Sequence, residues 1–263
     1  SADRLISNGD GSVIGLWVQN EETGAVSVAA SRGVILACGG FEANAEMQRQ
    51  YWQLNPVMTA AFRGNTGDGI RMAQDVGADL WHMWHFHGSY GFRHPDPAFP
   101  FGIRTKRLPD WVPEHSETNA QMSWILVDGK GGRFMNEYQP YLQDTGHRAL
   151  DVMNPDTQQY PYIPCYMIVD DPGRKMYPLG GVVFNDREVE PYEWSGDNLK
   201  EVELGILRKA ESLAELADHI GCAPAKLEAS IEKWNTACAA GEDDDFKRPS
   251  QSMTPITTAP YFV

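Results

Sequence analysis

The sequence predicts an α+β fold, and three observations lead to this prediction. Apolar and polar residues alternate near the N-terminus, as in strands. Residues 81–124 are rich in aromatic side chains without periodicity, and the last third has the apolar spacing of helices. The chain has 263 residues, enough for one or two domains of about 100–200 residues each. Its 42% hydrophobic and 22% charged residues are typical of a protein that buries a core.

The N-terminal part contains three predicted strands. Residues 12–19 and 25–30 alternate in polarity around a turn at residues 21–24, which predicts a hairpin. Residues 33–37, Gly-Val-Ile-Leu-Ala, predict a short buried strand that ends on Cys38-Gly39-Gly40.

Two helices are predicted to follow. Asn44 is a suitable N-cap for a helix whose inner face carries Met47 and Tyr51. The glycine-rich residues 64–69 lead into a helix over residues 70–76, for which Gly77 is the expected C-cap.

The middle and last parts differ in pattern. Residues 81–124 predict a long packed loop at a domain boundary, and long ordered loops tend to be functional. Residues 124–127 and 133–135 predict two strands joined by a glycine-rich turn, and residues 164–169 predict another strand.

The last third predicts two helices. Ser212 and Glu215 form a capping box, and a second helix begins near Pro224. Its inner face is expected to carry Leu227, Ile231, Trp234 and Cys238. The acidic residues 242–245 are interpreted as a solvated turn.

The charge balance excludes several classes of partner. With 22 Lys and Arg against 36 Asp and Glu, the formal charge is −14, which argues against nucleic acid and anionic membranes as partners. No apolar run approaches the about 20 residues of a membrane span, and the N-terminal residues do not form a signal peptide. The four cysteines show no C-x-x-C spacing, so the cytoplasm, a reducing compartment, is the default expectation.

Two glycine-rich segments are candidate ligand sites. Gly39-Gly40 after a strand lets backbone approach a flat or phosphorylated ligand, although an ordinary strand-to-helix turn has the same pattern. Gly64-x-x-Gly67-x-Gly69 exposes amides at a helix start, where anions bind, but it has neither the dinucleotide nor the P-loop spacing. Asp68 either binds a ligand or caps the helix.

Four blocks in order carry a resemblance to a known family. They are residues 33–44 (GVILACGGFEAN), residues 65–70 (NTGDGI) with Gly77-Ala78, residues 125–137 (ILVDGKGGRFMNE) and residues 210–246. Together they resemble the FAD-dependent fumarate reductase, flavocytochrome c and 3-ketosteroid dehydrogenase superfamily. The resemblance implies part of an FAD-binding Rossmann-like (ββα) domain and an α+β substrate cap domain of the fumarate reductase flavoprotein type.

The resemblance also implies domain bounds and cofactor contacts. Residues 1–82 would be the C-terminal portion of the FAD-binding domain, 83–258 the substrate cap, and 259–263 the start of the return to the FAD domain. The N-terminal G-x-G-x-x-G and the C-terminal T-x-G-G of the family are absent, so the chain looks like an internal fragment. One alternative to an active enzyme is therefore a non-catalytic fragment that does not retain FAD by itself. The residues implied to contact FAD are Ala37, Cys38, where the family usually has threonine, Gly39, Gly40, Asn44, Thr66, Gly67 and Asp68.

The resemblance implies a catalytic tyrosine. In the fumarate reductase branch an arginine that follows R-F-x-N-E donates a proton, and Tyr141 stands at that place here. This departure argues against a dicarboxylate substrate, which favours several arginines. Asn136-Glu137-x-x-Pro140-Tyr141 is similar to the 3-ketosteroid dehydrogenase branch, where such a tyrosine helps to remove a proton next to a ketone. Tyr141 is therefore the predicted catalytic residue, and the alternative is that it is a buried core tyrosine. The second enzymatic hypothesis is a fumarate-type reductase that acts on an unsaturated acid.

The aromatic loop suggests the substrate. Its residues 81–111 contain four of the seven histidines among aromatic residues. Such a wall suits a flat, largely apolar carbonyl compound, and aromatic packing at a domain junction is the alternative. His87, Tyr90 and Arg93 are the predicted pocket residues. His85 and His87 would share one face of a strand, but no acidic or cysteine partner lies at ligand spacing, so no metal site is predicted. The electron donor or acceptor is not identified by the sequence.

Overall fold

The computed structural model describes residues 1–84, 88, 90–108, 121–138, 149–181, 186, 188–189 and 192–263. The chain forms two compact units, residues 1–86 and residues 87–263, and each has a hydrophobic core of its own. Both helices and sheets occur, so the predicted α+β class is confirmed.

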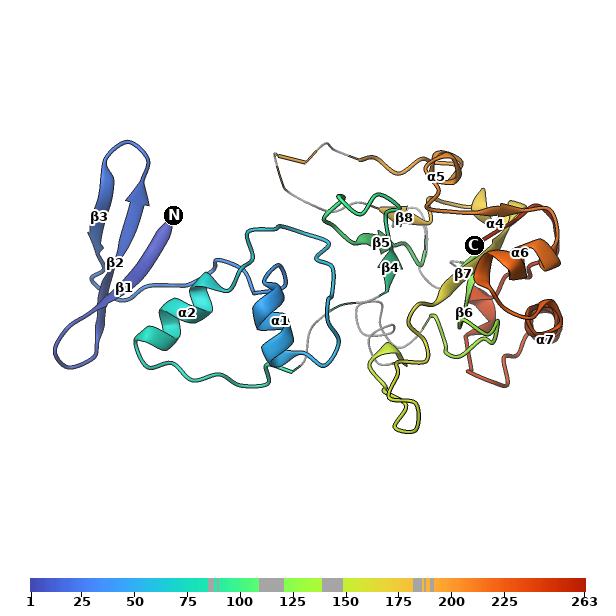
Figure 1. Ribbon diagram of the computed structural model, residues 1–263, viewed down its shortest axis with the longest axis horizontal. Helices are drawn as coiled ribbons and strands as arrows, with labels where there is room; N and C mark the ends of the chain where they lie inside the picture. Colours follow the sequence, from blue (N-terminus) through green and yellow to red (C-terminus); the bar gives the residue numbers. More distant parts are fainter. Residues whose placement is uncertain are drawn as a thin grey trace. The chain divides into compact units, whose positions relative to one another are not determined.

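The first unit begins with an antiparallel sheet of three strands, β1 (Ala2–Ser7), β2 (Val13–Asn20) and β3 (Gly24–Ala29), with β2 in the middle (Figure 1). The predicted hairpin is confirmed, while β1 was not predicted. Leu16 pairs with Leu5 on one side and Val28 on the other, which places three apolar side chains in a row on one face.

The predicted strand over residues 33–37 is wrong. These residues have no regular structure, and Ile35 is 92% exposed. A strand needs a neighbour to satisfy its backbone hydrogen bonds, and none of the described strands pairs with this segment. An apolar run alone therefore does not make a strand.

The two helices of the first unit are α1 (Ala45–Tyr51) and α2 (Asp68–Asp75). The N-cap prediction is confirmed, because the Asn44 side chain accepts hydrogen bonds from the amides of Glu46 and Met47. Helix α2 ends in a Schellman motif, in which Gly77 has φ +95° and the Ala78 amide donates to the Ala73 carbonyl at 3.0 Å. Phe41, Met47 and Trp52 form the core around α1.

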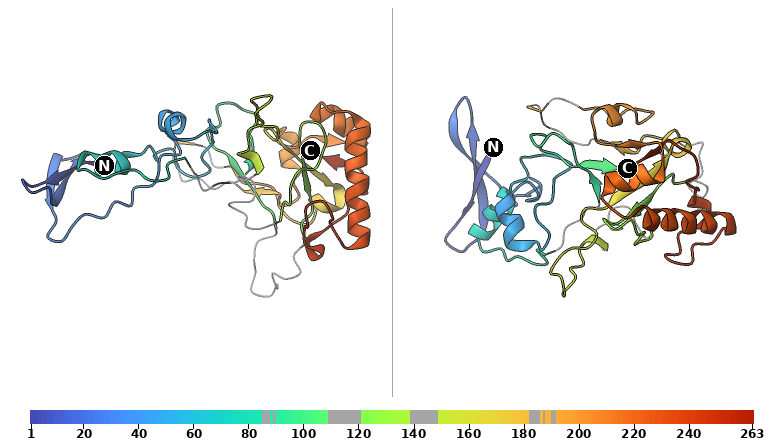
Figure 2. Two further views of the ribbon diagram at one scale, coloured as in Figure 1. Left: turned by 90° about the horizontal axis from the view of Figure 1, so that it is seen from below. Right: turned by 45° about the vertical axis from the view of Figure 1, so that its right-hand side comes forward.

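The second unit contains a four-stranded sheet with two helices beside it. Four strands, β6 (Ile125–Val127), β7 (Tyr166–Asp170), β10 (Tyr261–Phe262) and β9 (Lys209–Ala210), pair in that order. Helices α6 (Leu213–Ile220) and α7 (Pro224–Ala240) lie beside this sheet (Figures 1 and 2).

Both faces of this sheet are buried. Ile125, Val127 and Ile168 belong to a core shared with α6 and α7, whereas Leu126 and Val169 belong to a second core on the opposite face. Burial on two faces explains why β6 and β7 are continuous apolar runs without alternation. The predictions of strands at 124–127 and 164–169 and of both helices are confirmed.

The remaining elements are short. Strands β4 (Gly91–Phe92), β5 (Ile103–Thr105) and β8 (Gly180–Gly181) form a second antiparallel sheet in that order. Helices α4 (Asp171–Arg174) and α5 (Lys200–Glu203) and the 3₁₀ helix η2 (Ser250–Ser252) connect the larger elements.

Two further predictions are corrected. Residues 133–135 are not a strand, because only Arg133 makes a single bridge, to Val127. Asp243, in the acidic segment interpreted as solvated, is 3% exposed. Its carboxylate faces the guanidinium of Arg133 at 2.9 Å, across 110 residues of sequence.

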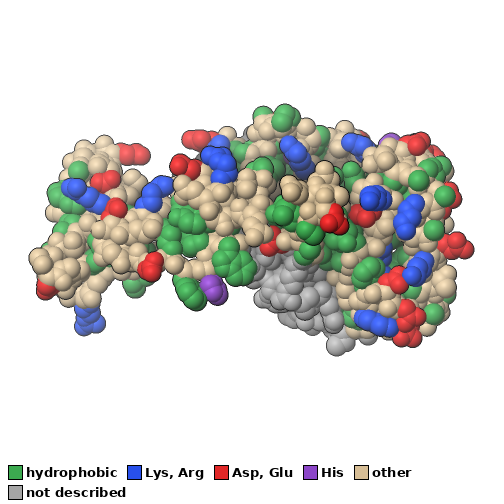
Figure 3. Space-filling view, turned by 60° about the horizontal axis from the view of Figure 1, so that its bottom comes forward, with side chains coloured by type: hydrophobic (Ala, Val, Ile, Leu, Met, Phe, Trp, Pro, Cys, Tyr) green, Lys and Arg blue, Asp and Glu red, His purple; other side chains and the backbone are tan. Residues whose placement is uncertain are grey.

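Charged side chains of both signs lie on the surface. On the face shown in Figure 3, Lys and Arg side chains are scattered among Asp and Glu side chains. Within the described ranges, none of the helices is long and apolar enough to cross a membrane.

Candidate functional site

The two predicted glycine segments lie side by side in the first unit. The Gly67 amide donates to the Gly40 carbonyl at 2.9 Å, and the Ala43 amide donates to the Asn65 carbonyl at 3.0 Å. The side chain of Asn44 also donates to the Thr66 carbonyl at 2.8 Å. The structure therefore joins two segments that are 22 or more residues apart in the chain into one backbone surface.

The glycines allow this close approach. Gly39 has φ +81°, and a Cβ there would lie 2.2 Å from Oδ1 of Asn65. Gly67 has φ +86°, and its Cβ would lie 2.4 Å from the sulfur of Met47. At both positions the left-handed backbone disfavours any residue with a Cβ, and that Cβ would also have to displace a neighbouring side chain.

Helix α2 begins at this surface with unused donors. Gly67 is its N-cap and supplies no side-chain hydrogen bond. Among the described residues, the amides of Asp68, Gly69 and Ile70 have no acceptor. Three such amides with the positive end of the helix dipole form an arrangement that binds anionic or acceptor-rich groups.

Asp68 does not cap the helix through its side chain. Its carboxylate is exposed and pairs with Arg71 one turn along the helix. A ligand hydroxyl or amide has access to this carboxylate, so a ligand contact at Asp68 stays a prediction.

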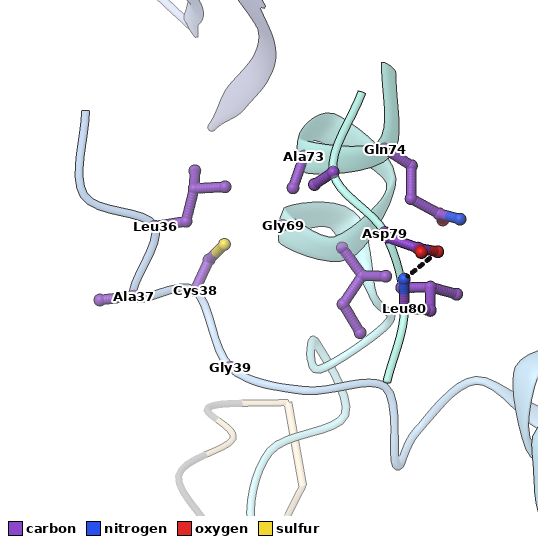
Figure 4. Close-up of a pocket in the computed structure, with 11 residues that line it drawn as sticks. Leu36, Ala37, Cys38, Gly39, Gly69, Ala73, Gln74, Asp79 and Leu80 are labelled. Atoms are coloured by element: carbon purple, nitrogen blue, oxygen red, sulfur yellow. Dashed lines mark hydrogen bonds between the residues drawn. The ribbon is translucent and has the colours of Figure 1, made fainter. Parts of the chain in front are cut away.

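An open pocket of about 330 Å³ adjoins these segments (Figure 4). The loop residues Ala37, Cys38 and Gly39 form one wall, and Gly69 and Ala73, one turn apart on α2, form the other. Figure 4 shows the thiol of Cys38 directed at the helix, and a Cβ at position 69 would lie 2.4 Å from its sulfur. Small residues therefore leave room between loop and helix.

Sequence reasoning missed part of this lining. Leu36, Ala73, Gln74, Asp79 and Leu80 also border the pocket. The spacing of Gly69 and Ala73 was the available signal, since small residues four apart share one helix face.

The predicted site residues of the second unit are not brought together by the described structure. Tyr141 and His87 lie outside the described residues. Tyr90 is buried in the core beside Trp124, with ring centroids 5.9 Å apart. Burial and the negative charge of Glu137 raise the pKa of its phenol above the usual value. Arg93 is exposed. Pocket roles for Tyr90 and Arg93 stay predictions.

The R-F-x-N-E motif forms a buried ion network. Glu137 is fully buried, and its carboxylate accepts from Nε and Nη2 of Arg133 at 2.9 and 2.8 Å. Nη1 of Arg248 lies 3.4 Å from the same carboxylate, and Nη1 of Arg133 reaches Asp243 at 2.9 Å. Burial opposes ionisation of Asp243, but the charge and hydrogen bond of Arg133, together with hydrogen bonds from the Arg248 and Phe246 amides, outweigh it and lower the pKa of that carboxyl.

This network connects distant segments, and the motif alone did not predict it. Arg248 also donates to the carbonyls of Trp124 and Met122 at 2.8 and 2.9 Å, which ties the C-terminal segment to β6. The guanidinium groups of Arg133 and Arg248 lie 4.5 and 4.8 Å from the centre of the Trp234 ring. The network holds the backbone immediately before the segment that contains Tyr141.

An aromatic cluster lies at the small sheet of the second unit. The rings of His94 and Phe99 are 4.6 Å apart, and those of Phe92 and Trp194 are 4.9 Å apart. These rings are only partly buried, apart from Trp194. The aromatic character predicted for residues 81–124 thus continues to a second segment, which the sequence analysis did not single out.

Metal-binding groups and cysteine pairs are two other possible kinds of site. No group of three or more His, Cys, Asp or Glu side chains there is arranged to hold a metal ion. The four cysteines are unpaired. Neither observation adds a second candidate site.

Comparison with known proteins places these features in context. The profile of a family described as "FAD binding domain" matches residues 1–263. The 3-oxosteroid 1-dehydrogenase of Mycolicibacterium smegmatis is 32% identical over 249 residues, which cover 91% of this chain and 39% of that protein. The urocanate reductase of Eggerthella lenta is 27% identical over 271 residues, which cover 100% of this chain and 38% of that protein.

A solved structure also resembles the chain. The 3-ketosteroid delta1-dehydrogenase from Sterolibacterium denitrificans, in complex with 1,4-androstadiene-3,17-dione, is 27% identical with a TM-score of 0.71. The match covers 99% of this chain and 46% of that one. The chain therefore spans about two fifths of the length of the curated relatives named above.

Proposed function

Because the chain belongs to the FAD-binding domain family, we propose that this protein is an FAD-dependent oxidoreductase that acts on a carbon–carbon bond next to a carbonyl group. The observation that carries the substrate class is the likeness to 3-oxosteroid 1-dehydrogenase at 32% identity, together with Tyr141 in place of an arginine after R-F-x-N-E. We propose a flat, largely apolar ketone as the substrate. The electron partner and a cytoplasmic location stay predictions.

FAD is the cofactor of this family, and the residues present fit it. The glycine surface has no side chains in the way, and the uncapped amides of Asp68, Gly69 and Ile70 match the acceptor atoms of a dinucleotide. When bound, FAD supplies a hydride acceptor or donor. The contacts proposed for it are Ala37, Cys38, Gly39, Gly40, Asn44, Thr66, Gly67 and Asp68.

The proposed domain roles follow from the same assignment. Residues 1–82 would belong to the FAD-binding domain, residues 83–258 to the substrate cap, and residues 259–263 to the return segment. The two compact units, 1–86 and 87–263, support a division in this part of the chain.

The proposed reaction moves one proton and one hydride. A carbonyl group makes the hydrogen on its α-carbon acidic, and Tyr141 as phenolate removes that proton. The electron pair left behind forms the new double bond as the β-carbon loses hydride, so the substrate loses two hydrogens and two electrons. In the opposite direction, the Tyr141 hydroxyl protonates the α-carbon while hydride arrives at the β-carbon.

The test uses the full-length protein with bound FAD. We expect a flavin absorption spectrum and turnover on cyclic 3-ketosteroid-like ketones. Tyr141→Phe is expected to lower turnover at least a hundredfold, since general acid–base groups typically contribute about 10²–10⁴, with FAD content unchanged. Tyr160→Phe is the matched control, because Tyr160 is a half-buried tyrosine of the same unit to which no role is assigned. Unchanged turnover in Tyr141→Phe removes this residue from the mechanism.

A second enzymatic function is favoured by the match to urocanate reductase along the whole chain. A reductase of an unsaturated carboxylic acid would convert urocanate or fumarate and leave cyclic enones unchanged, with a proton donor other than Tyr141. The formal charge of −14 weighs against an anionic substrate.

The third hypothesis concerns the 263 residues by themselves. If they do not retain FAD, a fluorescence titration of this polypeptide with FAD shows no saturable binding, while the full-length protein binds it. Stoichiometric binding by the 263-residue chain contradicts this hypothesis.

A further inference from the structure

Glu42 and Asn65 form a side-chain pair between the two glycine segments of the first unit. Glu42 follows Gly39-Gly40, and Asn65 lies in the glycine-rich residues 64–69. Nδ2 of Asn65 donates to Oε1 of Glu42 at 2.5 Å, and both side chains are half-buried. A hydrogen bond to a carboxylate is stronger than one between neutral groups, so this bond is suited to hold the two segments at one spacing.

Both members of the pair also lie against the glycines that precede Glu42. Oδ1 of Asn65 is 2.2 Å from the position that a Cβ on Gly39 would take. Oε2 of Glu42 is 2.8 Å from the corresponding position on Gly40. Each side chain therefore uses one atom for the hydrogen bond and packs another atom on a glycine. A change in either side chain changes the space beside these glycines.

The pair is connected to the core of the first unit through Gln48. This residue is 3% exposed, and its Nε2 donates to the carbonyls of Glu42 and Val57 at 2.6 and 2.8 Å. Its Oε1 accepts from the Val57 amide at 2.8 Å. Because both donor hydrogens and the acceptor of this buried amide have partners, it keeps one orientation. The core thus fixes the backbone of Glu42, while the carboxylate of Glu42 orients Asn65.

Backbone hydrogen bonds join the same two segments beside the pair. The Gly67 amide donates to the Gly40 carbonyl, and the Ala43 amide donates to the Asn65 carbonyl. These bonds involve neither side chain of the pair, so the segments remain joined when the pair is removed. What the pair adds is a fixed distance at the loop that precedes Gly40.

This spacing bears on cofactor binding more than on folding. The proposed FAD contacts lie on both segments, in residues 37–40 and in residues 66–68. A ligand that bridges two segments binds more tightly when their spacing is fixed in advance, because less conformational freedom is lost on binding. The pair is placed to control FAD affinity through the segments and without a contact of its own.

We propose that Glu42 and Asn65 are positioning residues for FAD: their hydrogen bond fixes the spacing of residues 37–40 and 64–69, and this spacing sets the affinity for the cofactor. The inference rests on the proposed function, in which both segments contact FAD. The pair needs one donor that faces one acceptor, and the charge of the carboxylate strengthens that bond. Donor and acceptor can therefore be exchanged between the two positions.

The experiment measures the dissociation constant of FAD by fluorescence titration of full-length protein from which FAD has been removed. Glu42→Ala removes the acceptor, and Asn65→Asp replaces the donor with a second carboxylate oxygen. The double variant Glu42→Gln with Asn65→Asp exchanges donor and acceptor and leaves the net charge of the pair unchanged. Glu46→Ala is the matched control, because Glu46 is an exposed glutamate of the same unit.

We expect Glu42→Ala and Asn65→Asp to raise the dissociation constant of FAD about tenfold, as for the loss of one hydrogen bond to a charged group. The double variant should return to within about threefold of the wild type, and Glu46→Ala should show no measurable change. Without FAD, the melting temperature of each variant should fall by no more than about 2–4 °C, since the backbone bonds remain. A purely structural role would lower this temperature and leave the FAD affinity of the folded protein unchanged.

Two results would overturn the proposal. One is a Glu42→Ala protein that binds FAD as tightly as the wild type. The other is a double variant that binds FAD no better than Asn65→Asp alone. If Glu42→Ala does not fold, the second comparison decides, because restored affinity in the double variant supports the proposal and equal weakness contradicts it.

The proposed function fails in a different way. A wild-type protein that binds FAD but converts no ketone refutes the proposed substrate, while the FAD titration still tests the pair. A full-length wild-type protein that binds no FAD refutes both the proposed function and the role of the pair.

Discussion

The buried network around Glu137 gives the strongest prediction about stability. Glu137→Gln keeps the shape of the side chain but removes its charge, and it places an amide nitrogen among donors. The carboxylate now accepts from the Leu126 amide at 3.1 Å and from three nitrogens of Arg133 and Arg248. The variant leaves Arg248, which is 2% exposed, without its carboxylate partner.

The magnitude follows from burial. Removing one member of a buried ion pair typically costs about 3–5 kcal/mol, because the remaining charge is left without compensation. For a chain of this size, each kcal/mol lost from the free energy of unfolding lowers the melting temperature by about 2–4 °C. The melting temperature of Glu137→Gln should therefore fall by about 6–20 °C. Part of the charge of Arg133 stays compensated by Asp243, which favours the lower end of that range.

The assay is thermal unfolding of the full-length protein, followed by tryptophan fluorescence. Trp234 is a suitable reporter because both guanidinium groups lie against its ring. The control is Glu242→Gln, whose partner Lys247 lies 3.6 Å away at an exposed site, and we expect no measurable change. If the melting temperature of Glu137→Gln equals that of Glu242→Gln within experimental error, the reasoning about burial is refuted.

Two further predictions concern the glycine surface and acid stability. Gly67→Ala should lower FAD affinity and the free energy of unfolding by at least about 1–2 kcal/mol, because φ is +86° and the new Cβ would meet Met47. The assay is an FAD fluorescence titration, and the control is Gly9→Ala, which has open space around it. Equal FAD affinities of the two variants would contradict the prediction. The pKa of Asp243 is lowered in the folded state, so its stabilisation is complete above the unfolded-state value of about 3.9 and is lost as pH falls through the folded-state value. Between pH 5 and pH 2, the wild type should therefore lose more unfolding free energy than Asp243→Asn, and parallel curves would count against this assignment.

Local features were predictable because their interactions lie within a few residues. The Asn44 cap, the hairpin of β2 and β3 and the helix after Ser212 each depend on hydrogen bonds or apolar spacing inside one short segment. The hydroxyl of Ser212 accepts from the Glu215 amide at 3.2 Å, as the capping box predicts. Cofactor binding was indicated by motif order, and the family assignment agrees with it.

Long-range features were not predictable in the same way. The apolar segment 33–37 was expected to form a strand, but strand formation depends on a neighbour that the pattern of one segment does not specify. Asp243 was expected to be solvated, but it meets Arg133 across 110 residues of sequence. In both cases the partner, and not the residue itself, decides the outcome.

The sequence by itself determined the class of fold, the capped helices, the glycine segments and the family to which the chain belongs. Only the tertiary structure decided which charges are paired and that the two glycine segments share one surface. The physical reason is that backbone propensity acts between neighbours in the chain, whereas burial and electrostatic pairing depend on the folded position of residues far apart in it.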